Sequence, residues 1–206
     1  MRLRSFFVTL RAIYYNLLMQ DLILIGRQGS GKGTQGKILA EKFGYQIFET
    51  GGALRAMAAQ DSDLGRQVKE ITGRGDLVSN EIVMAIVREF LASLDPSTPV
   101  IFDGIPRSEV QRESLEAELK AAGRNRNALQ IRISNEEAVH RLLKRSEIEG
   151  RADDNITAIQ KRLQNFEEHT QPILEIWAER DLLVAIDGVA PIEAVHEAVV
   201  SSLGLN

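Results

Sequence analysis

The sequence predicts an α/β fold built on a parallel sheet of five strands flanked by helices. Three observations predict it. Five short apolar runs alternate with longer amphipathic segments, a glycine-rich turn follows the first run, and polar residues follow directly after some of the other apolar runs. Strands separated by helices form parallel sheets covered on both faces, and such strands read as almost continuous apolar runs. We therefore expect one domain whose polar groups gather at one edge of the sheet.

Length and composition exclude several classes of protein. The chain has 206 residues, of which 44% are hydrophobic, and this suffices for one domain with a full core. Its net charge of -4 argues against a protein that coats nucleic acid. Cysteine is absent, which excludes disulfides and thiolate zinc sites. The three histidines are not spaced as a pair of ligands, so we expect no structural metal.

Residues 1–18 differ in composition from the rest of the chain. Their only charges are Arg2, Arg4 and Arg11, and their apolar stretches are too short for a secretory signal or for a membrane span of about 20 residues. The basic, acid-free composition leaves an organelle transit peptide open, although the segment contains a single serine. Our preferred hypothesis is that this extension lies outside the native protein and that Met19 is the natural start, because the first strand is expected three residues later.

The first half of the chain holds three of the expected strands. Leu22–Ile25 is an uninterrupted apolar run, and a helical pattern over 35–43 follows the glycine-rich turn. Gln46–Phe48 is a short second strand, and Val100–Asp103 is a third, bounded by proline and glycine. The helices expected between the second and third strands cover 53–60, 63–72 and 80–93.

The second half of the chain continues the alternation of helix and strand. The helix expected over 109–122 stops at Gly123. Leu129–Ile133 and Leu183–Asp187 are the fourth and fifth strands. The remaining helices are expected over 135–146, over 154–179 with a bend near Pro172, and over 191–202.

The glycine-rich turn, Gly26–Thr34, has the features of a phosphate-binding loop. Glycines allow backbone conformations closed to other residues, so successive N–H groups can point at an anion near the positive end of the following helix. Lys32 adds a full charge where terminal phosphates would lie. The strict pattern expects Ser or Thr directly after the lysine, but here Gly33 intervenes and the hydroxyl comes at Thr34. With the lysine in register and a strand before it, we favour a nucleotide site over a plain turn.

Asp103 ends the third strand, at the edge of the sheet where ligands bind in open α/β folds. A carboxylate beside a phosphate-binding loop is placed to hold Mg²⁺ through its water shell, because Mg²⁺ keeps several waters and bridges phosphates. The alternative is that Asp103 only caps the turn after the strand. The neighbouring loop favours the metal.

Six arginines fall in segments that return to the same end of the expected sheet: Arg55, Arg107, Arg141, Arg145, Arg151 and Arg162. Phosphoryl transfer requires positioning and charge neutralisation more than covalent chemistry. The planar guanidinium group makes paired bonds to phosphate and keeps its proton. One such arginine is ordinary surface charge, but six beside the loop indicate phosphate chemistry. Asp153 and Asp154 either orient the arginines or favour the start of the next helix, and both interpretations stay open.

Four segments carry a family resemblance that covers nearly everything from Met19 to the C-terminus. They are Gly26–Gln35, Thr50–Arg55, Asp103–Arg107 with Gln111, and Arg141–Arg162. In these motifs the sequence resembles the nucleoside monophosphate kinases, and most closely the adenylate kinases, including the Gly-Thr after the lysine. The resemblance implies a P-loop kinase domain over 19–206, with a five-stranded parallel sheet, a monophosphate-binding insert at about 49–79 and a short lid at about 141–152.

The resemblance also implies roles for residues on the ATP side. The loop residues that would wrap the phosphates are Gly29, Ser30, Gly31, Lys32, Gly33 and Thr34. Arg141 would pack on the adenine, and the backbone near Ala190 would meet the same base. Asp103 would hold Mg²⁺ through water. The catalytic cations that would surround the transferring group are Lys32, Arg107, Arg145, Arg151 and Arg162.

On the acceptor side, the resemblance implies a site for AMP. Arg55 and Arg107 would hold its phosphate, with Arg151 and Arg162 beside it. The remaining acceptor-site residues would be Thr50, Asp76, Leu77, Val78, Gly104, Ile105, Pro106 and Gln111. Thr50 and Gln111 favour AMP, because the related UMP/CMP kinases usually carry Ala and Asn at those places. A side-chain amide pairs with an adenine edge by donating and accepting together.

Five positions depart from the family pattern: Gln28 for Pro, Gly52 for Asp, Ile105 for Phe, Thr72 for Met, and Asp76 for Lys or Gln. These differences bear on the specificity and affinity for the acceptor. None removes a phosphate-binding charge, so we expect the transfer chemistry to be retained.

We therefore predict a cytoplasmic monomer that binds ATP and AMP and catalyses the reversible, Mg²⁺-dependent reaction ATP + AMP ⇌ 2 ADP. No nucleic-acid or membrane partner is expected. A strong general base is not needed, because an oxygen of the AMP phosphate is already ionised at neutral pH. Two alternatives stay open: the acceptor is UMP, CMP or another monophosphate, or the protein is a nucleotide-binding module without turnover.

Overall fold

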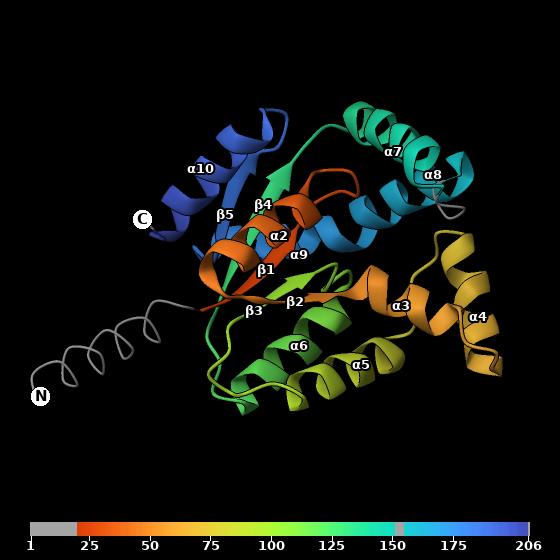
Figure 1. Ribbon diagram of the computed structural model, residues 1–206, viewed down its shortest axis with the longest axis horizontal. Coiled ribbons are helices and arrows are strands. Elements are labelled where there is room, and N and C mark those ends of the chain that lie inside the picture. Colours follow the sequence, from red (N-terminus) through yellow and green to blue (C-terminus); the bar gives the residue numbers. More distant parts are fainter. Residues whose placement is uncertain (1–19, 151–154, 206) are drawn as a thin grey trace, which may run out of the picture.

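The computed structural model describes residues 20–150 and 155–205 (Figure 1). The expected N-terminal extension, residues 1–18, lies outside the described residues together with Met19. In the part of the chain that is described, no helix has the length and apolar character needed to cross a membrane.

The centre of the molecule is a parallel sheet of five strands in the order β2-β3-β1-β4-β5. The strands are β1 (Asp21–Ile25), β2 (Gln46–Glu49), β3 (Val100–Asp103), β4 (Arg126–Arg132) and β5 (Leu183–Asp187). The predicted fold class is confirmed. The fourth strand begins three residues earlier than expected, because the polar residues Arg126 and Asn127 continue the ladder with β1 opposite Asp21 and Leu22.

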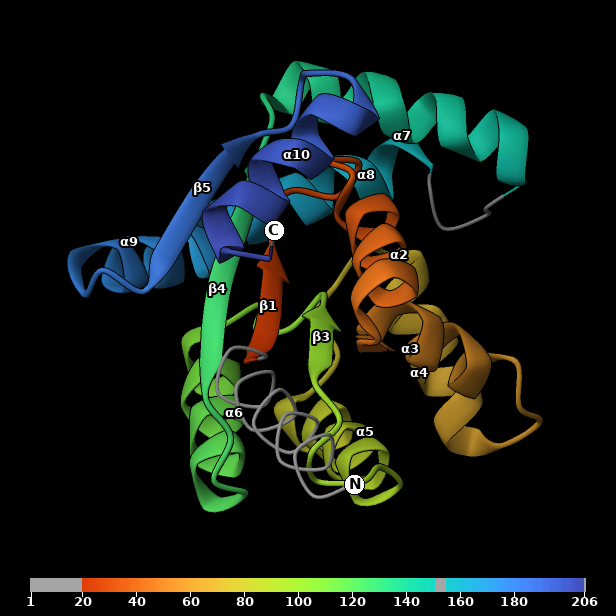
Figure 2. The ribbon, with the colours of Figure 1, turned by 60° about the vertical axis from the view of Figure 1, so that its left-hand side comes forward.

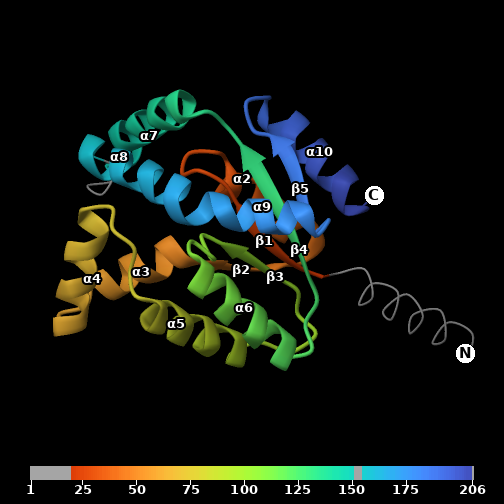
Figure 3. The same ribbon diagram turned by 180° about the vertical axis from the view of Figure 1, so that it is seen from behind.

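Helices cover both faces of the sheet (Figures 2 and 3). They are α2 (Lys32–Phe43), α3 (Thr50–Ala58), α4 (Asp63–Gly73), α5 (Asn80–Ala92), α6 (Glu109–Ala121), α7 (Asn135–Glu149), α8 (Ile156–Asn165), α9 (Gln171–Glu179) and α10 (Ile192–Leu203). Side chains alternate across a strand, so β1 serves two cores. Leu22 and Leu24 pack with α2 and α10, whereas Ile23 packs with α5, α6 and α9.

The segment expected as one helix over 154–179 is divided into three parts. Between α8 and α9, Phe166–Thr170 forms a π-helix, η1. Pro172 lies in the first turn of α9 and has no N–H to donate, so regular α-helical hydrogen bonding cannot run through this point. The bend expected near Pro172 is thus a widened turn directly before it.

The expected insert, about 49–79, takes in α3 and α4, and the expected lid, about 141–152, takes in the second half of α7. Residues 151–154 lie outside the described residues, and with them Arg151, Asp153 and Asp154. Figure 3 shows both helix pairs at the same end of the molecule, with α7 and α8 at the top and α3 and α4 below them.

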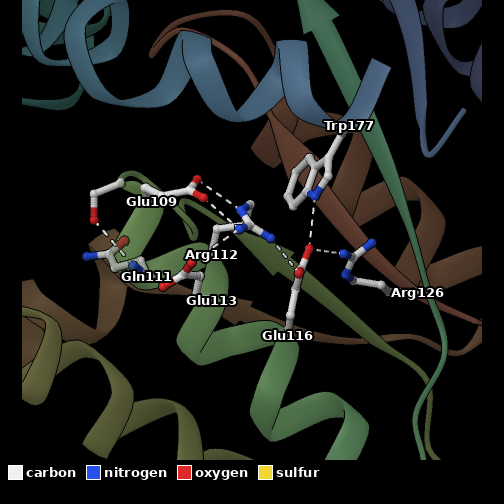
Figure 4. Close-up of polar contacts among 8 residues, drawn as sticks. Glu109, Gln111, Arg112, Glu113, Glu116, Arg126 and Trp177 are labelled. Carbon is white, nitrogen blue, oxygen red and sulfur yellow. Dashed lines mark hydrogen bonds and ion pairs between the residues drawn. The ribbon is translucent and has the colours of Figure 1, made fainter. Parts of the chain in front are cut away.

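A polar cluster joins α6 to β4 and α9 (Figure 4). Glu116 accepts hydrogen bonds from Arg112 at 2.6 Å and from the indole N–H of Trp177 at 3.0 Å, and it forms an ion pair with Arg126. The Arg126 guanidinium lies 5.1 Å from the centre of the Trp177 ring. The carboxylate of Glu116 therefore satisfies three donors, two of them charged.

Replacing Glu116 with alanine is expected to lower the free energy of unfolding by about 3 kcal/mol, because it leaves charged and polar donors without their acceptor in a mostly buried cluster. Glu113 is the matched control on the same helix: it lies 3.7 Å from Arg112 and is 67% exposed. Its replacement with alanine is expected to cost less than about 1 kcal/mol. Urea unfolding of both variants checks this, and equal losses would contradict it.

Candidate functional site

A cavity of about 410 Å³ opens at the carboxyl ends of β1 and β3. The glycine-rich loop forms one wall, and residues of α3, α7, α8 and η1 form others. A smaller cavity of about 40 Å³ adjoins it and shares several lining residues, among them Gly104, Arg107 and Arg162. The larger volume is in the range of small-molecule sites.

The glycine-rich loop presents bare backbone to the larger cavity. Gly26 has a φ of +147°, and a Cβ there would lie 2.4 Å from the carbonyl oxygen of Ile131, so no larger residue fits. Gly31 has a φ of +96° and precedes the first residue of α2. No neighbouring heavy atom lies within 4 Å of the position of its missing Cβ. The first N–H groups of a helix have no acceptor within the helix, and the start of α2 lines the larger cavity, so these groups are placed to bind an anion there.

Lys32 is held inside the loop by two backbone acceptors. Its Nζ donates to the carbonyl oxygens of Gly26 at 2.9 Å and Arg27 at 3.0 Å. Burial lowers the pKa of Lys32 from its usual 10.5; Asp103 opposes this, while Arg107 and Arg145 add to it. A bound anion would stabilise the charged ammonium group and raise its pKa again, which is consistent with an anion-binding position.

Asp103 is the carboxylate of the larger cavity nearest the loop. It ends β3 opposite Leu24 of β1 and Glu49 of β2. Burial raises its pKa, Lys32 and Arg107 counteract the rise, and Glu49 adds to it. Its Oδ2 lies 3.6 Å from the position that a Cβ on Gly33 would occupy, so the carboxylate faces the loop.

Five of the six expected arginines line the larger cavity: Arg55, Arg107, Arg141, Arg145 and Arg162. The sixth, Arg151, lies outside the described residues. Arg55 pairs with Glu49 at 2.8 Å, and Arg141 pairs with Glu137 at 2.5 Å. Arg107 is partly buried, and its Nε donates to the carbonyl oxygen of Gly104 at 2.8 Å. An Arg162 amino group donates to the carbonyl oxygen of Thr72 at 3.4 Å.

The residues expected around the acceptor divide between the two cavities. Ile105 and Pro106 line the larger one. The smaller one is lined by Thr50, Asp76, Leu77, Val78, Gly104, Arg107, Gln111 and Arg162. The buried hydroxyl of Thr50 has no hydrogen-bond partner among the described residues. The carbonyl of the Gln111 side chain accepts from the backbone N–H of Arg107 at 2.8 Å, which leaves the amide N–H groups of Gln111 to donate.

Two residues expected on the ATP side are absent from the lining of both cavities, Ser30 and Ala190. Ser30 is 2% exposed because its hydroxyl turns toward Gly26 beneath the loop. Ala190 is exposed on the turn before α10. That turn does touch the loop, since a Cβ on Gly188 would lie 3.0 Å from the carbonyl oxygen of Ser30. The remaining loop residues expected to wrap the ATP phosphates, Gly29 and Gly31 to Thr34, line the larger cavity.

Several cavity residues were missed from the sequence. They are Gln28, Lys37, Glu49, Asn165, Phe166 and Thr170. Glu49 ends β2 as Asp103 ends β3, so the criterion that selected Asp103 could have found it. Asn165, Phe166 and Thr170 lie at the break between α8 and α9, inside what reads as one continuous helix, and no sequence signal marks them.

The chain matches one family of known proteins over most of its length. The sequence model of the family described as "Adenylate kinase" matches residues 24–182. The chain is similar to the adenylate kinase of Thermus thermophilus, with 36% identity over 187 residues, 90% of this chain and 98% of the relative. It is 38% identical to that of Xanthomonas campestris over 184 residues (89% and 98%), and 40% identical to that of Hyphomonas neptunium over 185 residues (89% and 97%).

Proposed function

Because the chain belongs to the adenylate kinase family, it transfers a phosphoryl group between ATP and AMP, and we propose which of its residues do so. The observation that carries the proposal is one cavity in which the glycine-rich loop, Lys32, Asp103 and five arginines face the same space. Reactions of this kind depend on positioning the two substrates and on neutralising charge, and this cavity has the groups for both.

ATP binds with its phosphates in the glycine-rich loop. The backbone N–H groups from Gly29 to Thr34 surround them at the start of α2, and Lys32 reaches the terminal phosphates. Ser30 contributes its backbone only, since its side chain is buried beneath the loop. Arg141 packs on the adenine, and the turn that contains Ala190 meets the same base; the contact of that turn with Ser30 supports this.

AMP binds on the side of α3 and α4. Arg55 and Arg107 hold its phosphate, and Thr50, Gln111 and the backbone from Asp76 to Val78 surround its base. The hydroxyl of Thr50 supports this assignment, because it has no hydrogen-bond partner among the described residues and Thr50 lines the smaller cavity, where a ligand can supply one. Gln111 donates to the base through its amide N–H groups, since its carbonyl already accepts from Arg107.

The transferring group lies between Lys32 and Arg107, and Arg145 and Arg162 complete the ring of cations in the larger cavity. Arg151 lies outside the described residues, and its part in the transfer is proposed from the family resemblance alone. No side chain has to remove a proton, because the attacking phosphate oxygen is ionised at neutral pH. The cations neutralise the charge on the moving group, and the α7–α8 segment excludes water from it.

Asp103 fits a magnesium ion held through water. One buried carboxylate beside the phosphate site suits Mg²⁺, which takes most of its ligands from waters and phosphate oxygens. When bound, the ion would supply positive charge that neutralises the phosphate groups. The resemblance to the adenylate kinases also supports a monomeric, cytoplasmic enzyme; light scattering after size-exclusion chromatography tests the monomer.

An acceptor panel tests the proposed reaction. The purified protein is given ATP and Mg²⁺ with AMP, UMP or CMP, and ADP formation is followed by a coupled assay. We expect turnover with AMP at least tenfold above that with UMP or CMP, and its loss when a chelator removes Mg²⁺. Faster turnover with UMP or CMP would change the acceptor, and no turnover with any acceptor would leave only a nucleotide-binding module.

A further inference from the structure

Arg27 is the second residue of the glycine-rich loop, yet its side chain does not line either cavity, although its neighbours Gly26 and Gln28 line the larger one. The side chain is only 18% exposed. It makes four contacts with residues more than 100 positions away in the sequence. Such a set of contacts is unusual for a loop residue and calls for a physical reason.

The first two contacts lie where the chain enters α7. Nε of Arg27 donates to the side-chain carbonyl of Asn135 at 2.6 Å, and NH1 donates to the backbone carbonyl of Ile133 at 3.1 Å. The other two contacts lie where the chain leaves α8. NH2 forms an ion pair with Glu167, and the guanidinium carbon lies 4.9 Å from the centre of the Phe166 ring.

Arg27 therefore contacts both ends of one unit, because α7 and α8 are consecutive helices that contact each other. Figures 1 and 3 show these two helices together at the edge of the molecule. They carry Arg141, Arg145 and Arg162, which line the larger cavity. The positions of these three cations relative to the glycine-rich loop therefore depend on the contacts that fix the ends of α7 and α8.

The backbone of Arg27 is hydrogen-bonded to Lys32 of the same loop. Its carbonyl oxygen accepts from Nζ of Lys32 at 3.0 Å. One residue thus touches Lys32 through its main chain and both ends of the α7–α8 pair through its side chain. The planar guanidinium group suits this task, because its fork of donors fixes several partners at once, which a lysine ammonium cannot do in the same geometry.

The segment that Arg27 contacts after α8 is also tied to the acceptor side. The side-chain amide of Asn165 donates to the carbonyl oxygen of Gly75 at 3.0 Å, and the hydroxyl of Thr170 donates to the carbonyl oxygen of Arg107 at 3.0 Å. The π-helix η1 and its flanks therefore connect the glycine-rich loop, the insert and Arg107. π-helical turns occur frequently at functional sites.

We propose that Arg27 is a positioning residue for phosphoryl transfer, which holds the helix pair bearing Arg141, Arg145 and Arg162 in register with Lys32. The proposal rests on the function proposed above for those cations. The ion pair with half-exposed Glu167 contributes little by itself. The role comes from the four contacts acting together on one rigid group.

The test measures kcat and both KM values for Arg27→Ala and Arg27→Lys. A displacement of about 1 Å among reacting groups costs up to roughly 100-fold in rate, so we expect kcat to fall about 10- to 100-fold in Arg27→Ala. The KM for ATP is expected to rise as well, because Arg141 packs on the adenine, whereas the KM for AMP is expected to stay within about threefold. Arg27→Lys is expected to recover little of the rate, because one ammonium group cannot meet all four partners.

A double-mutant cycle and a matched control complete the experiment. Glu167→Gln is expected to lower kcat about threefold, and to add almost nothing to Arg27→Ala, because both changes affect the same contact. Arg88→Ala is the control: it removes an ion pair of 2.8 Å between α5 and α6, away from both cavities, and kcat should not change.

Each outcome decides the proposal. If the unaltered protein lacks turnover, the proposed function fails first, and Arg27 has no reaction to position. If the unaltered protein is active and folded Arg27→Ala keeps its kcat within about twofold, Arg27 only stabilises the fold and the proposal is overturned. If Arg27→Ala does not fold, Asn135→Ala and Glu167→Ala each remove a single contact, and an unchanged kcat in both would overturn the proposal.

Discussion

Replacing Lys32 with alanine is expected to lower kcat for ATP and AMP by about three orders of magnitude or more, the range found when a charged group that meets the transferring phosphoryl group is lost. The Lys32 ammonium is buried against the loop, where burial lowers its pKa and Asp103 opposes that effect. It is the cation nearest to the N–H groups at the start of α2. Steady-state rates with saturating ATP and AMP measure the loss.

Lys42→Ala is the control for this prediction, because Lys42 lies on the last turn of the same helix and is exposed. Its kcat is expected to match that of the unaltered protein. Near-normal turnover in Lys32→Ala, with the variant folded by circular dichroism, would show that the loop does not hold the transferring phosphates.

Arg107→Ala is expected to have an effect of similar size, with kcat lowered about 1,000-fold. Arg107 lines both cavities and so lies between the donor and acceptor sides. Its Nε donates to the carbonyl oxygen of Gly104, so the turn after β3 fixes the orientation of the two remaining guanidinium nitrogens. Arg107→Lys is not expected to restore the rate, because a single ammonium cannot reproduce a bidentate contact with phosphate.

Arg66 provides the matched control for Arg107. It lies on α4 in the insert, is 63% exposed and pairs with Asp61 and Asp63. Arg66→Ala should leave kcat within about twofold of the unaltered protein. If Arg107→Ala were as mild as Arg66→Ala, the acceptor phosphate would not lie where the two cavities meet.

Most of the fold could be predicted from sequence because it depends on local patterns. Buried parallel strands are apolar runs, and the phosphate loop carries its own glycines and lysine. The extra residues of β4, Arg126 and Asn127, could not be predicted, since pairing with β1 overrides their polarity. Pro172 predicted only a bend in one long helix. The π-helix before it could not be predicted, because the sequence on both sides keeps a helical period.

The site was predicted less completely, for a physical reason. Residues at strand ends, such as Asp103, are brought together by the topology of the sheet, which the sequence pattern predicts. Contacts between distant segments are not encoded in any local pattern. Arg27 reads as one more charge in a loop, and only the structure brings it to Asn135 and Glu167.

In the proposed site, ATP and AMP meet end to end between Lys32 and Arg107. Calorimetric binding of an analogue in which two adenosines are joined through five phosphates tests it most directly. We expect this analogue to bind at least 100-fold more tightly than ATP or AMP alone, because one molecule fills both sites, and to be displaced by either nucleotide. Displacement by ATP alone, with an affinity no higher than that of ATP, would contradict the account.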